Sequence, residues 1–304
     1  MIRTAIASCL VFLAMSSTAL AQSCAGDPVS VQILGSGGPA LRPDRASTGY
    51  VLWVDSQAKM LVDMGGGSFF RFGQAQAKFT DLALVAVSHL HPDHVSDLPA
   101  LLWSSRTTRS GSLPIAGPSG NNVAPNFSTF LNRLFDAKDG AFQVLGPIMA
   151  ASPGNPGVVR LDPHVVDVAK PDPTTVFDRD GMTVTALGIP HGNLPTLAYR
   201  VQTRGLSVVF SSDQTGTNPR FVDFAKGANI LVMHLATNAA DSPLHASPAA
   251  VGRIAREAGV GRLIVSHIGM FDLDPAIAEL KASYAGPLTV GADLQCTQVR
   301  PNGG

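Results

Sequence analysis

Short runs of apolar residues recur along the whole chain, rich in Val, Ile and Leu and bounded by Gly, Pro, Asp or Ser. Short runs of this composition, bounded by residues that favour turns, are typical of β-strands buried on both faces. The sequence therefore predicts strands at residues 29–34, 50–54, 60–62, 82–87, 184–189, 206–210, 230–233 and 263–265.

Helical patterns lie between some of these predicted strands. Ser247 can cap a helix that begins with Pro248 and repeats apolar residues on one face until Gly259 stops it, so we expect a helix over residues 247–258. A second pattern covers residues 275–284. Strands interleaved with helices indicate an α/β architecture in which helices cover the sheets. No clear linker divides the sequence, which predicts a single domain.

The segment 140–173 differs from the rest of the chain, because it is dense in Pro, Gly and Asp and has little periodicity. It is interpreted as a long loop outside the predicted elements. Long structureless loops in compact domains are often functional, so a lid or pocket wall is one interpretation and an inert surface insertion is the other.

The first 21 residues have the pattern of a secretory signal peptide. Arg3 supplies the positive start, residues 5–15 are apolar, and residues 19–21 match a small-residue cleavage site. The apolar run is too short to anchor a protein permanently in a membrane. We therefore expect cleavage after Ala21, a mature hydrolase domain of residues 22–304 with no membrane attachment, and a periplasmic or secreted location.

Charge narrows the range of expected partners. The 22 basic and 22 acidic residues cancel, and no cluster of Lys and Arg stands out. Proteins that bind nucleic acids normally carry a basic patch. From charge alone we expect no nucleic-acid partner.

Two cysteines remain after signal cleavage, Cys24 and Cys296, near opposite ends of the mature chain. In an oxidising compartment they could form a disulfide bond. Closing so long a loop would stabilise the fold by about 5 kcal/mol on the chain-entropy model. Two unrelated free thiols are the alternative.

Residues able to bind metals or to titrate concentrate where the predicted strands end. Five apolar runs each finish at such a residue: His89, His191, Asp213, His234 and His267. In open α/β sheets, ligands bind beyond the carboxyl ends of the strands, so these residues are expected at one crevice.

The densest group of such residues is the segment Ser88-His89-Leu90-His91-Pro92-Asp93-His94. Residues two apart at a strand end point the same way, so His89 and His91 would aim at one point, and the turn through Pro92 would direct Asp93 and His94 to a neighbouring point. A single buried histidine is more often an ordinary core residue than a ligand, but this density favours metal binding. Two adjacent cations fit it better than one.

Neutral imidazole and carboxylate are ordinary zinc ligands. The expected ligands form two groups of three and one bridging carboxylate, namely His89, His91 and His191; Asp93, His94 and His267; and Asp213. Such a set matches a two-metal hydrolytic site. Two Zn²⁺ ions are the predicted cofactors, with Mn²⁺ or Fe²⁺ as alternatives.

The pattern His-x-His-x-Asp-His, followed at a distance by His, Asp and His, resembles that of the metallo-β-lactamase superfamily. Within it, the sequence is most similar to the ribonuclease Z and arylsulfatase-like branch. The resemblance covers essentially the whole mature chain and implies a four-layer αβ/βα sandwich with a dinuclear site at one edge of two packed sheets. The segments that carry it are 34–38 with Arg45, 61–65, 88–102, 190–200, 211–213, 234–237 and 245–248.

The resemblance also implies roles for residues outside the ligand set. Asp63 would support and orient the ligand loop. His245 would lie near the scissile ester and assist the leaving group. Leu235 stands where the branch has glutamate, so the role of His234 is left open between participation in the reaction and a supporting position beside the ligands.

Together these features predict an exported dinuclear zinc hydrolase that cleaves an ester bond of a small anionic substrate, either a phosphodiester or an aryl sulfate ester. Asp93 would orient the attacking hydroxide and accept its proton, and His245 would assist departure of the alcohol. Both residues are therefore predicted to be catalytic. The oligomeric state is left open, with a homodimer as one option.

Three alternatives use the same residues. One is a lactonase or β-lactamase-like hydrolase, although β-lactam hydrolases of this superfamily often have cysteine at the position of Asp213 and lack a counterpart of His94. Another is an iron oxidoreductase on the same fold, which would replace some histidines with acidic residues. The third is a non-catalytic periplasmic protein that binds a metal or ligand without turnover.

Overall fold

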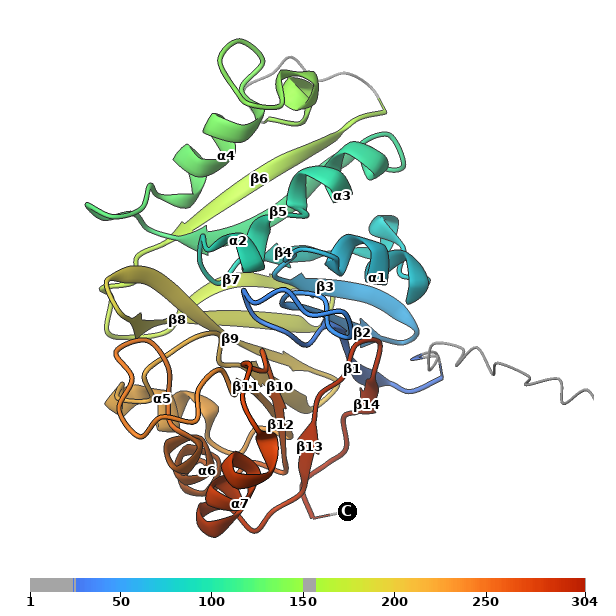
Figure 1. Cartoon of the computed structure of the whole chain (residues 1–304). Helices are drawn as coiled ribbons and strands as arrows, with labels where there is room; N and C mark the ends of the chain where they lie inside the picture. The colour runs from blue at the N-terminus through green and yellow to red at the C-terminus, as the bar shows by residue number, and fades with distance from the viewer. Residues whose placement is uncertain (1–23, 25, 150–156, 304) are drawn as a thin grey trace, which may run out of the picture.

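The computed structural model describes residues 24, 26–149 and 157–303, so the predicted signal peptide lies outside the described residues. Within these ranges, two seven-stranded sheets pack face to face, and helices cover the outer face of each (Figure 1). This four-layer α/β sandwich confirms the predicted fold class.

The first sheet contains the N-terminal half of the chain and one strand from its C-terminal end. Its strands, in spatial order, are β14 (Cys296–Gln298), β1 (Val29–Gly35), β2 (Gly49–Val54), β3 (Gln57–Val62), β4 (Leu84–Ala86), β5 (Gly111–Pro118) and β6 (Val159–Val166). The strands from β3 to β6 run parallel to one another.

The second sheet is built entirely from the C-terminal half. Its strands, in spatial order, are β13 (Leu288–Val290), β12 (Arg262–Ser266), β11 (Ile230–His234), β10 (Leu206–Phe210), β9 (Leu194–Thr203), β8 (Met182–His191) and β7 (Thr174–Arg179). The strands from β10 to β13 are parallel, so their carboxyl ends meet at one edge of the sheet.

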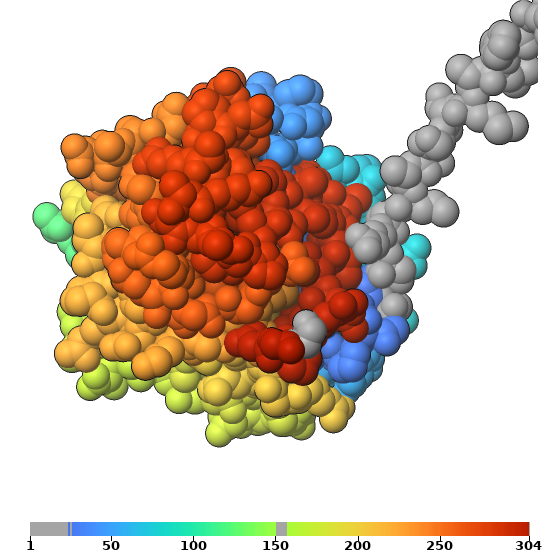
Figure 2. Space-filling model, turned by 90° about the horizontal axis from the view of Figure 1, so that it is seen from below, coloured from blue at the N-terminus to red at the C-terminus, as the bar shows by residue number. Residues whose placement is uncertain are grey.

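The helices divide between the two outer faces. The first sheet carries α1 (Ser68–Gln74), α2 (Pro92–Val95), α3 (Leu98–Ser105) and α4 (Phe127–Phe135), with the 3₁₀ helices η1 (Phe79–Asp81) and η2 (Gln143–Ile148). The second sheet carries α5 (Pro219–Ala225), α6 (Pro248–Glu257) and α7 (Leu273–Ser283), and the orange and red C-terminal segments form the face seen in Figure 2. None of the helices in the described part of the chain is long and apolar enough to cross a membrane.

The predicted helix at 247–258 is confirmed as α6. Ser247 caps it, because its hydroxyl oxygen accepts a hydrogen bond from the backbone N–H of Ala250 at 3.3 Å. Pro248 occupies the first turn, where a missing N–H costs no intrahelical bond. The second predicted helix, at 275–284, corresponds to α7.

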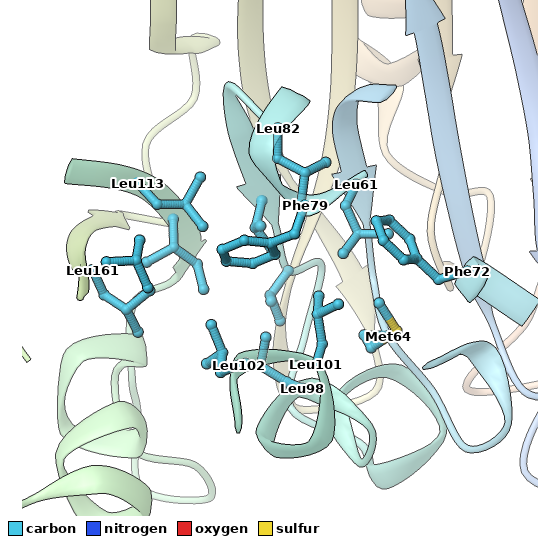
Figure 3. Packing of buried hydrophobic residues seen from close by; sticks show 14 of the residues in the cluster. Leu61, Met64, Phe72, Phe79, Leu82, Leu98, Leu101, Leu102, Leu113 and Leu161 are labelled. Carbon is cyan, nitrogen blue, oxygen red and sulfur yellow. The ribbon is translucent and has the colours of Figure 1, made fainter. Parts of the chain in front are cut away.

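Three apolar layers hold the sandwich together, and β2 shows how one strand contributes to two of them. Val51 and Trp53 face the helices, whereas Tyr50, Leu52 and Val54 face the other sheet. Because both faces are covered, such strands are apolar at every position. The outer layer of the first sheet is drawn in Figure 3, where leucines of α3 lie opposite those of the sheet, and the labelled members include Leu98, Leu101, Leu102, Leu61 and Leu113.

The prediction of a long loop at 140–173 is wrong for much of that segment. It contains η2 and the edge strand β6, which pairs in parallel with β5. Val159 and Leu161 of β6 are buried in the outer core layer, but Pro163 interrupts the apolar pattern in a way that an edge strand tolerates. Residues 150–156 lie outside the described residues, and the lid remains only a prediction.

Cys24 and Cys296 form a disulfide bond, with 5.7 Å between their Cα atoms. The bond joins the N-terminal end of the described chain to β14. The structure therefore contains the pairing that the sequence left open against two free thiols.

Candidate metal centre

The predicted site residues gather at the edge of the sandwich where several strands end. His191 and His234 are the last residues of β8 and β11, His267 directly follows β12, and Asp213 lies shortly after β10. The histidine-rich segment 88–94 follows β4 of the other sheet. The site is thus built from both sheets.

One group consists of the three imidazoles of His89, His91 and His191. Nε2 of His89 lies 3.1 Å from Nδ1 of His91, and Nε2 of His191 lies 3.4 Å from the same Nδ1 atom. One nitrogen from each ring lies within 4.8 Å of the other two, the reach expected of ligands to a single ion. His89 and His191 are buried whereas His91 is partly exposed, so this group meets solvent at His91.

A second group consists of Asp93, His94 and His267. Oδ2 of Asp93 lies 3.2 Å from Nε2 of His267 and 3.6 Å from Nε2 of His94. Asp93 and His94 belong to α2, a single turn that begins with Pro92, and both are buried. The short helix therefore directs two neighbouring side chains into the same group.

Asp213 lies between the two groups. Its Oδ2 atom is 3.2 Å from Nε2 of His267, 3.7 Å from Nε2 of His94 and 3.8 Å from Nε2 of His191. One carboxylate oxygen is thus close to imidazoles of both groups, which is the placement that a bridging ligand requires. All seven residues expected to be ligands are brought together in this way.

Asp63 fixes the orientation of two of these imidazoles. Its Oδ1 accepts the backbone N–H of Ser88 at 2.7 Å, and its Oδ2 lies 2.8 Å from both the Ser88 hydroxyl and Nδ1 of His94. Because the Ser88 hydroxyl donates its hydrogen bond to Asp63, its oxygen can accept a hydrogen bond from Nδ1–H of His89 at 3.0 Å. In the neutral form of both rings, the Nε2 lone pair then points into the cluster, as metal ligation needs.

His191 and His234 differ in how their ring nitrogens are used. Nδ1 of His191 lies 2.9 Å from the carbonyl oxygen of Leu244, so its Nε2 is left for the cluster. His234 is 2.7 Å from the carbonyl oxygen of Ser212 through Nδ1, and its Nε2 accepts the backbone N–H of Ala246 at 3.2 Å. Both nitrogens of His234 are therefore occupied by the backbone, which favours the supporting position for this residue.

His245 lies at the side of the cluster. Its Nδ1 is 3.9 Å from Oδ2 of Asp213, and its ring lies 5.1 Å from that of His191, centroid to centroid. Burial, followed by the neighbouring His234, lowers the pKa of His245 to about 3. The side chain is nevertheless 18% exposed, so this ring can meet a molecule that enters from solvent.

The electrostatics of the cluster fit a divalent cation. Burial opposes charge on His94 and His267, yet the surrounding carboxylates raise the pKa of both rings. Burial likewise opposes charge on Asp213, but the same imidazoles hold its pKa well below the usual range. Nε2 of His94 and Oδ1 of Asp213 are buried without a hydrogen-bond partner among the described residues. Unpaired polar atoms and carboxylates in one buried cluster are what a bound cation would satisfy.

The backbone is unusual at three positions of the site. Asp63, Ser212 and His267 have φ values of 58°, 51° and 50°, in the left-handed region that residues other than glycine seldom adopt. Such conformations persist where the surrounding structure dictates them and cluster at functional sites. Gly65 adds a steric requirement, because a Cβ atom there would lie 1.9 Å from the carbonyl oxygen of Asp93.

Two contributions to the site were not predicted from the sequence. Ser88 was recognised as part of the motif, but its hydroxyl is the link between Asp63 and His89. Its position between a buried strand and the first histidine is the feature of the sequence that could have indicated this role. The carbonyl of Leu244, which orients His191, has no signal in the sequence because any residue can supply it.

Two packed sheets with a buried histidine and aspartate cluster at the strand ends form the frame of a metal-dependent enzyme, and the comparisons identify its class. The family model described as Beta-lactamase superfamily domain matches residues 60–268, and the chain belongs to this superfamily. The solved structures that match this chain also have the metallo-β-lactamase fold.

The relatives in sequence include enzymes named ribonuclease Z. The chain is 27% identical over 301 residues to that of Mycobacterium bovis, covering 90% of this chain and 99% of the relative. It is 28% identical over 293 residues to that of Mycolicibacterium paratuberculosis, covering 89% and 98%. Among solved structures, human tRNase Z, short form, has a TM-score of 0.69 at 18% identity and is matched over 99% of its chain and 89% of this one.

These relatives correct the prediction of partners. A small anionic ester and no nucleic acid were expected, whereas relatives matched over nearly their full length are named as enzymes that act on RNA. The prediction rested on the zero net charge, the lack of a Lys/Arg cluster in the sequence and the signal-like N-terminus, none of which describes the charge around a folded site. A hydrolase needs positive charge only around the scissile bond, where bound cations can supply it.

Proposed function

We propose that the protein is a metal-dependent phosphodiesterase that hydrolyses RNA. The observation that carries the proposal is the convergence of seven imidazole and carboxylate side chains, from segments far apart in the sequence, on one cluster. The ribonuclease Z relatives, aligned over almost the whole mature chain, support an RNA phosphodiester as the substrate.

Two divalent cations, with zinc as the first candidate, would be held at this cluster. His89, His91 and His191 would hold one, Asp93, His94 and His267 the other, and Asp213 would contact both. Imidazole nitrogen with carboxylate oxygen favours zinc, while Mn²⁺ and Fe²⁺ accept the same donors. When bound, such ions supply Lewis acidity that activates water and withdraws charge from a phosphate.

The chain's own residues have separate tasks in this proposal. Asp93, whose carboxylate lies 3.2 Å from Nε2 of His267 within the cluster, would orient the attacking water and accept its proton. His245, neutral at pH 7 because burial depresses its pKa, would donate an N–H hydrogen bond to an ester oxygen as the bond breaks. Asp63 and Ser88 would hold the ligand rings still during the reaction.

Export is part of the proposal. The first 21 residues have the composition of a signal peptide. The disulfide between Cys24 and Cys296 supports an oxidising compartment such as the periplasm, since structural disulfides are rare in the bacterial cytosol. The substrate would then be RNA outside the cytoplasm.

The test is turnover by purified residues 22–304 loaded with Zn²⁺. A labelled RNA oligonucleotide and a chromogenic phosphodiester should both be cleaved, and His91→Ala should reduce both rates about a thousandfold or more, because Lewis-acid stabilisation amounts to several kcal/mol. His164→Ala, in an exposed histidine on β6, is the matched control and should retain full activity. A fully active His91→Ala enzyme, or turnover only of sulfate esters, lactones or β-lactams, would contradict the proposal.

A further inference from the structure

Asp293 lies in the turn between β13 and β14, and its side chain is only 7% exposed. The turn is fastened to both sheets. The backbone N–H of Gly291 donates to the carbonyl of Val265 in β12 at 2.8 Å, and the N–H of Leu294 donates to the carbonyl of Ile33 in β1 at 2.7 Å. The backbone that carries the carboxylate of Asp293 is therefore fixed relative to both sheets.

Both oxygens of this carboxylate accept hydrogen bonds from residues near the other end of the chain. Oδ1 accepts the backbone N–H of Ser36 at 2.9 Å and its hydroxyl at 2.7 Å. Oδ2 accepts the backbone N–H of Ala46 at 2.8 Å and Nε–H of Arg71 at 3.1 Å. Asp293 thus ties the two ends of segment 36–46 to one point.

Arg45 closes the same arrangement from the other side. Its Nη1 donates to the hydroxyl oxygen of Ser36 at 2.7 Å and to the carbonyl of Gly291 at 2.6 Å. The arginine side chain is 13% exposed. The carboxylate, the hydroxyl and the guanidinium form one buried network, and buried charged groups of this kind are costly to leave unpaired.

The segment held by this network packs directly against the metal centre. The backbone N–H of Ile268 donates to the carbonyl of Ser36 at 2.8 Å. A Cβ atom on Gly38 would lie 2.5 Å from Cε1 of His267, so the backbone of the segment touches the imidazole ring. Nε2 of the same ring also faces Asp93 and Asp213, each at 3.2 Å. The ring of His267 is therefore held by the segment and by the two carboxylates together.

We propose that Asp293 is a positioning residue of the metal centre, which holds segment 36–46 against His267 and so fixes the imidazole of the second ligand group. The proposal deepens the proposed function and rests on its metal site. Asp293 does not touch the cluster, and it acts on one of the two ligand groups. Its loss should affect the group of Asp93, His94 and His267 and spare the three imidazoles of His89, His91 and His191.

The test is a titration of the metal-free mature chain with Co²⁺, whose visible spectrum reports ligand geometry. His267→Ala and His91→Ala provide the spectra that follow loss of each ligand group. Asp293→Asn keeps the shape of the side chain, but only one of its two terminal atoms can still accept hydrogen bonds. We expect it to weaken the His267 ion about tenfold or more, with a spectrum shifted toward that of His267→Ala and the other ion unchanged. Asp172→Asn, in an exposed ion pair with Arg220, is the matched control.

A second pair of variants keeps the test possible if Asp293→Asn does not fold. Gly38→Ala pushes on the His267 ring directly and should weaken the same ion, whereas Gly73→Ala, with nothing within 4 Å of its new Cβ, should leave both ions as in the wild type. Unchanged affinities in both Asp293→Asn and Gly38→Ala, or equal loss of both ions, would overturn the positioning role. A wild-type chain that binds no Co²⁺ would instead overturn the proposed function, and this inference with it.

Discussion

Oδ2 of Asp63 lies 2.8 Å from Nδ1 of His94, and both side chains are buried. This contact selects the nitrogen that His94 presents to the cluster, because a carboxylate accepts the Nδ1 proton and leaves Nε2 as the ligand atom. The same carboxylate reaches His89 through Ser88. One aspartate outside the ligand set therefore orients an imidazole in each ligand group.

Replacing Asp63 should consequently weaken both ions. For Asp63→Asn we expect metal affinity to fall by about 10-fold to 100-fold, the usual cost of removing a hydrogen-bond partner of a ligand. Competition with a chromophoric chelator measures the dissociation constants. Asp55→Asn, in an exposed ion pair with Arg204, serves as control. Wild-type affinity in Asp63→Asn would show that the contact does not orient the ligands.

His234 should make the metal-free protein sensitive to acid. Burial lowers its pKa from 6.5 to about 4, so the folded ring remains neutral at pH values where the unfolded chain has already bound a proton. Above pH 6.5 the residue contributes no pH dependence, and between pH 6.5 and 4 it lowers stability as the pH falls, by up to about 1.4 kcal/mol per pH unit.

Denaturant unfolding of the metal-free chain at pH 7 and pH 5 checks this expectation. The loss of unfolding free energy between the two pH values should be smaller in His234→Gln than in the wild type, by about 1 to 2 kcal/mol. His164→Gln, at a partly exposed histidine on β6 of the other sheet, is the matched control. An unchanged pH dependence in His234→Gln would mean that the folded ring already titrates normally.

His245→Ala should separate metal binding from turnover. The ring is not needed by either group of three ligands, so two ions should remain bound, while loss of its hydrogen bond to the ester should reduce kcat about 10²-fold to 10⁴-fold. Steady-state kinetics on a chromogenic phosphodiester, with metal content measured on the same sample, test both parts. Metal loss in His245→Ala would make the residue a ligand, and unchanged kcat would remove it from the reaction.

The sequence was most informative where strands are buried on both faces. The predicted strand 206–210 agrees with β10, in which every residue but Ser207 is apolar and residues 207–210 are buried. The strands β5 and β9 were not predicted, since Pro114 and Gly117 in one, and Pro195 in the other, are normally turn signals. Strand pairing overrides that local preference, since β5 joins β4 and β6 in parallel and β9 forms hairpins with its sequence neighbours β8 and β10.

The clustering of the imidazoles and carboxylates could be predicted because chemistry at strand ends leaves a side-chain pattern in the sequence. What supports the ligands could be predicted only in part. The link from Asp293 to Ser36 depends on packing between the two ends of the chain, and the carbonyl of Leu244 depends on backbone geometry alone. The nucleic-acid substrate of the ribonuclease Z relatives was not anticipated, because overall charge carries no information on where charge is needed.

The central claim is that the cluster holds two cations, and the metal content of the purified mature chain tests it most directly. Mass spectrometric quantification should give about two equivalents of divalent metal per wild-type chain, the number that a two-metal hydrolytic site requires. His91→Ala and Asp213→Ala should each bind less metal than the wild type and lose turnover. A wild-type chain with no bound metal that still hydrolyses the phosphodiester would contradict the account.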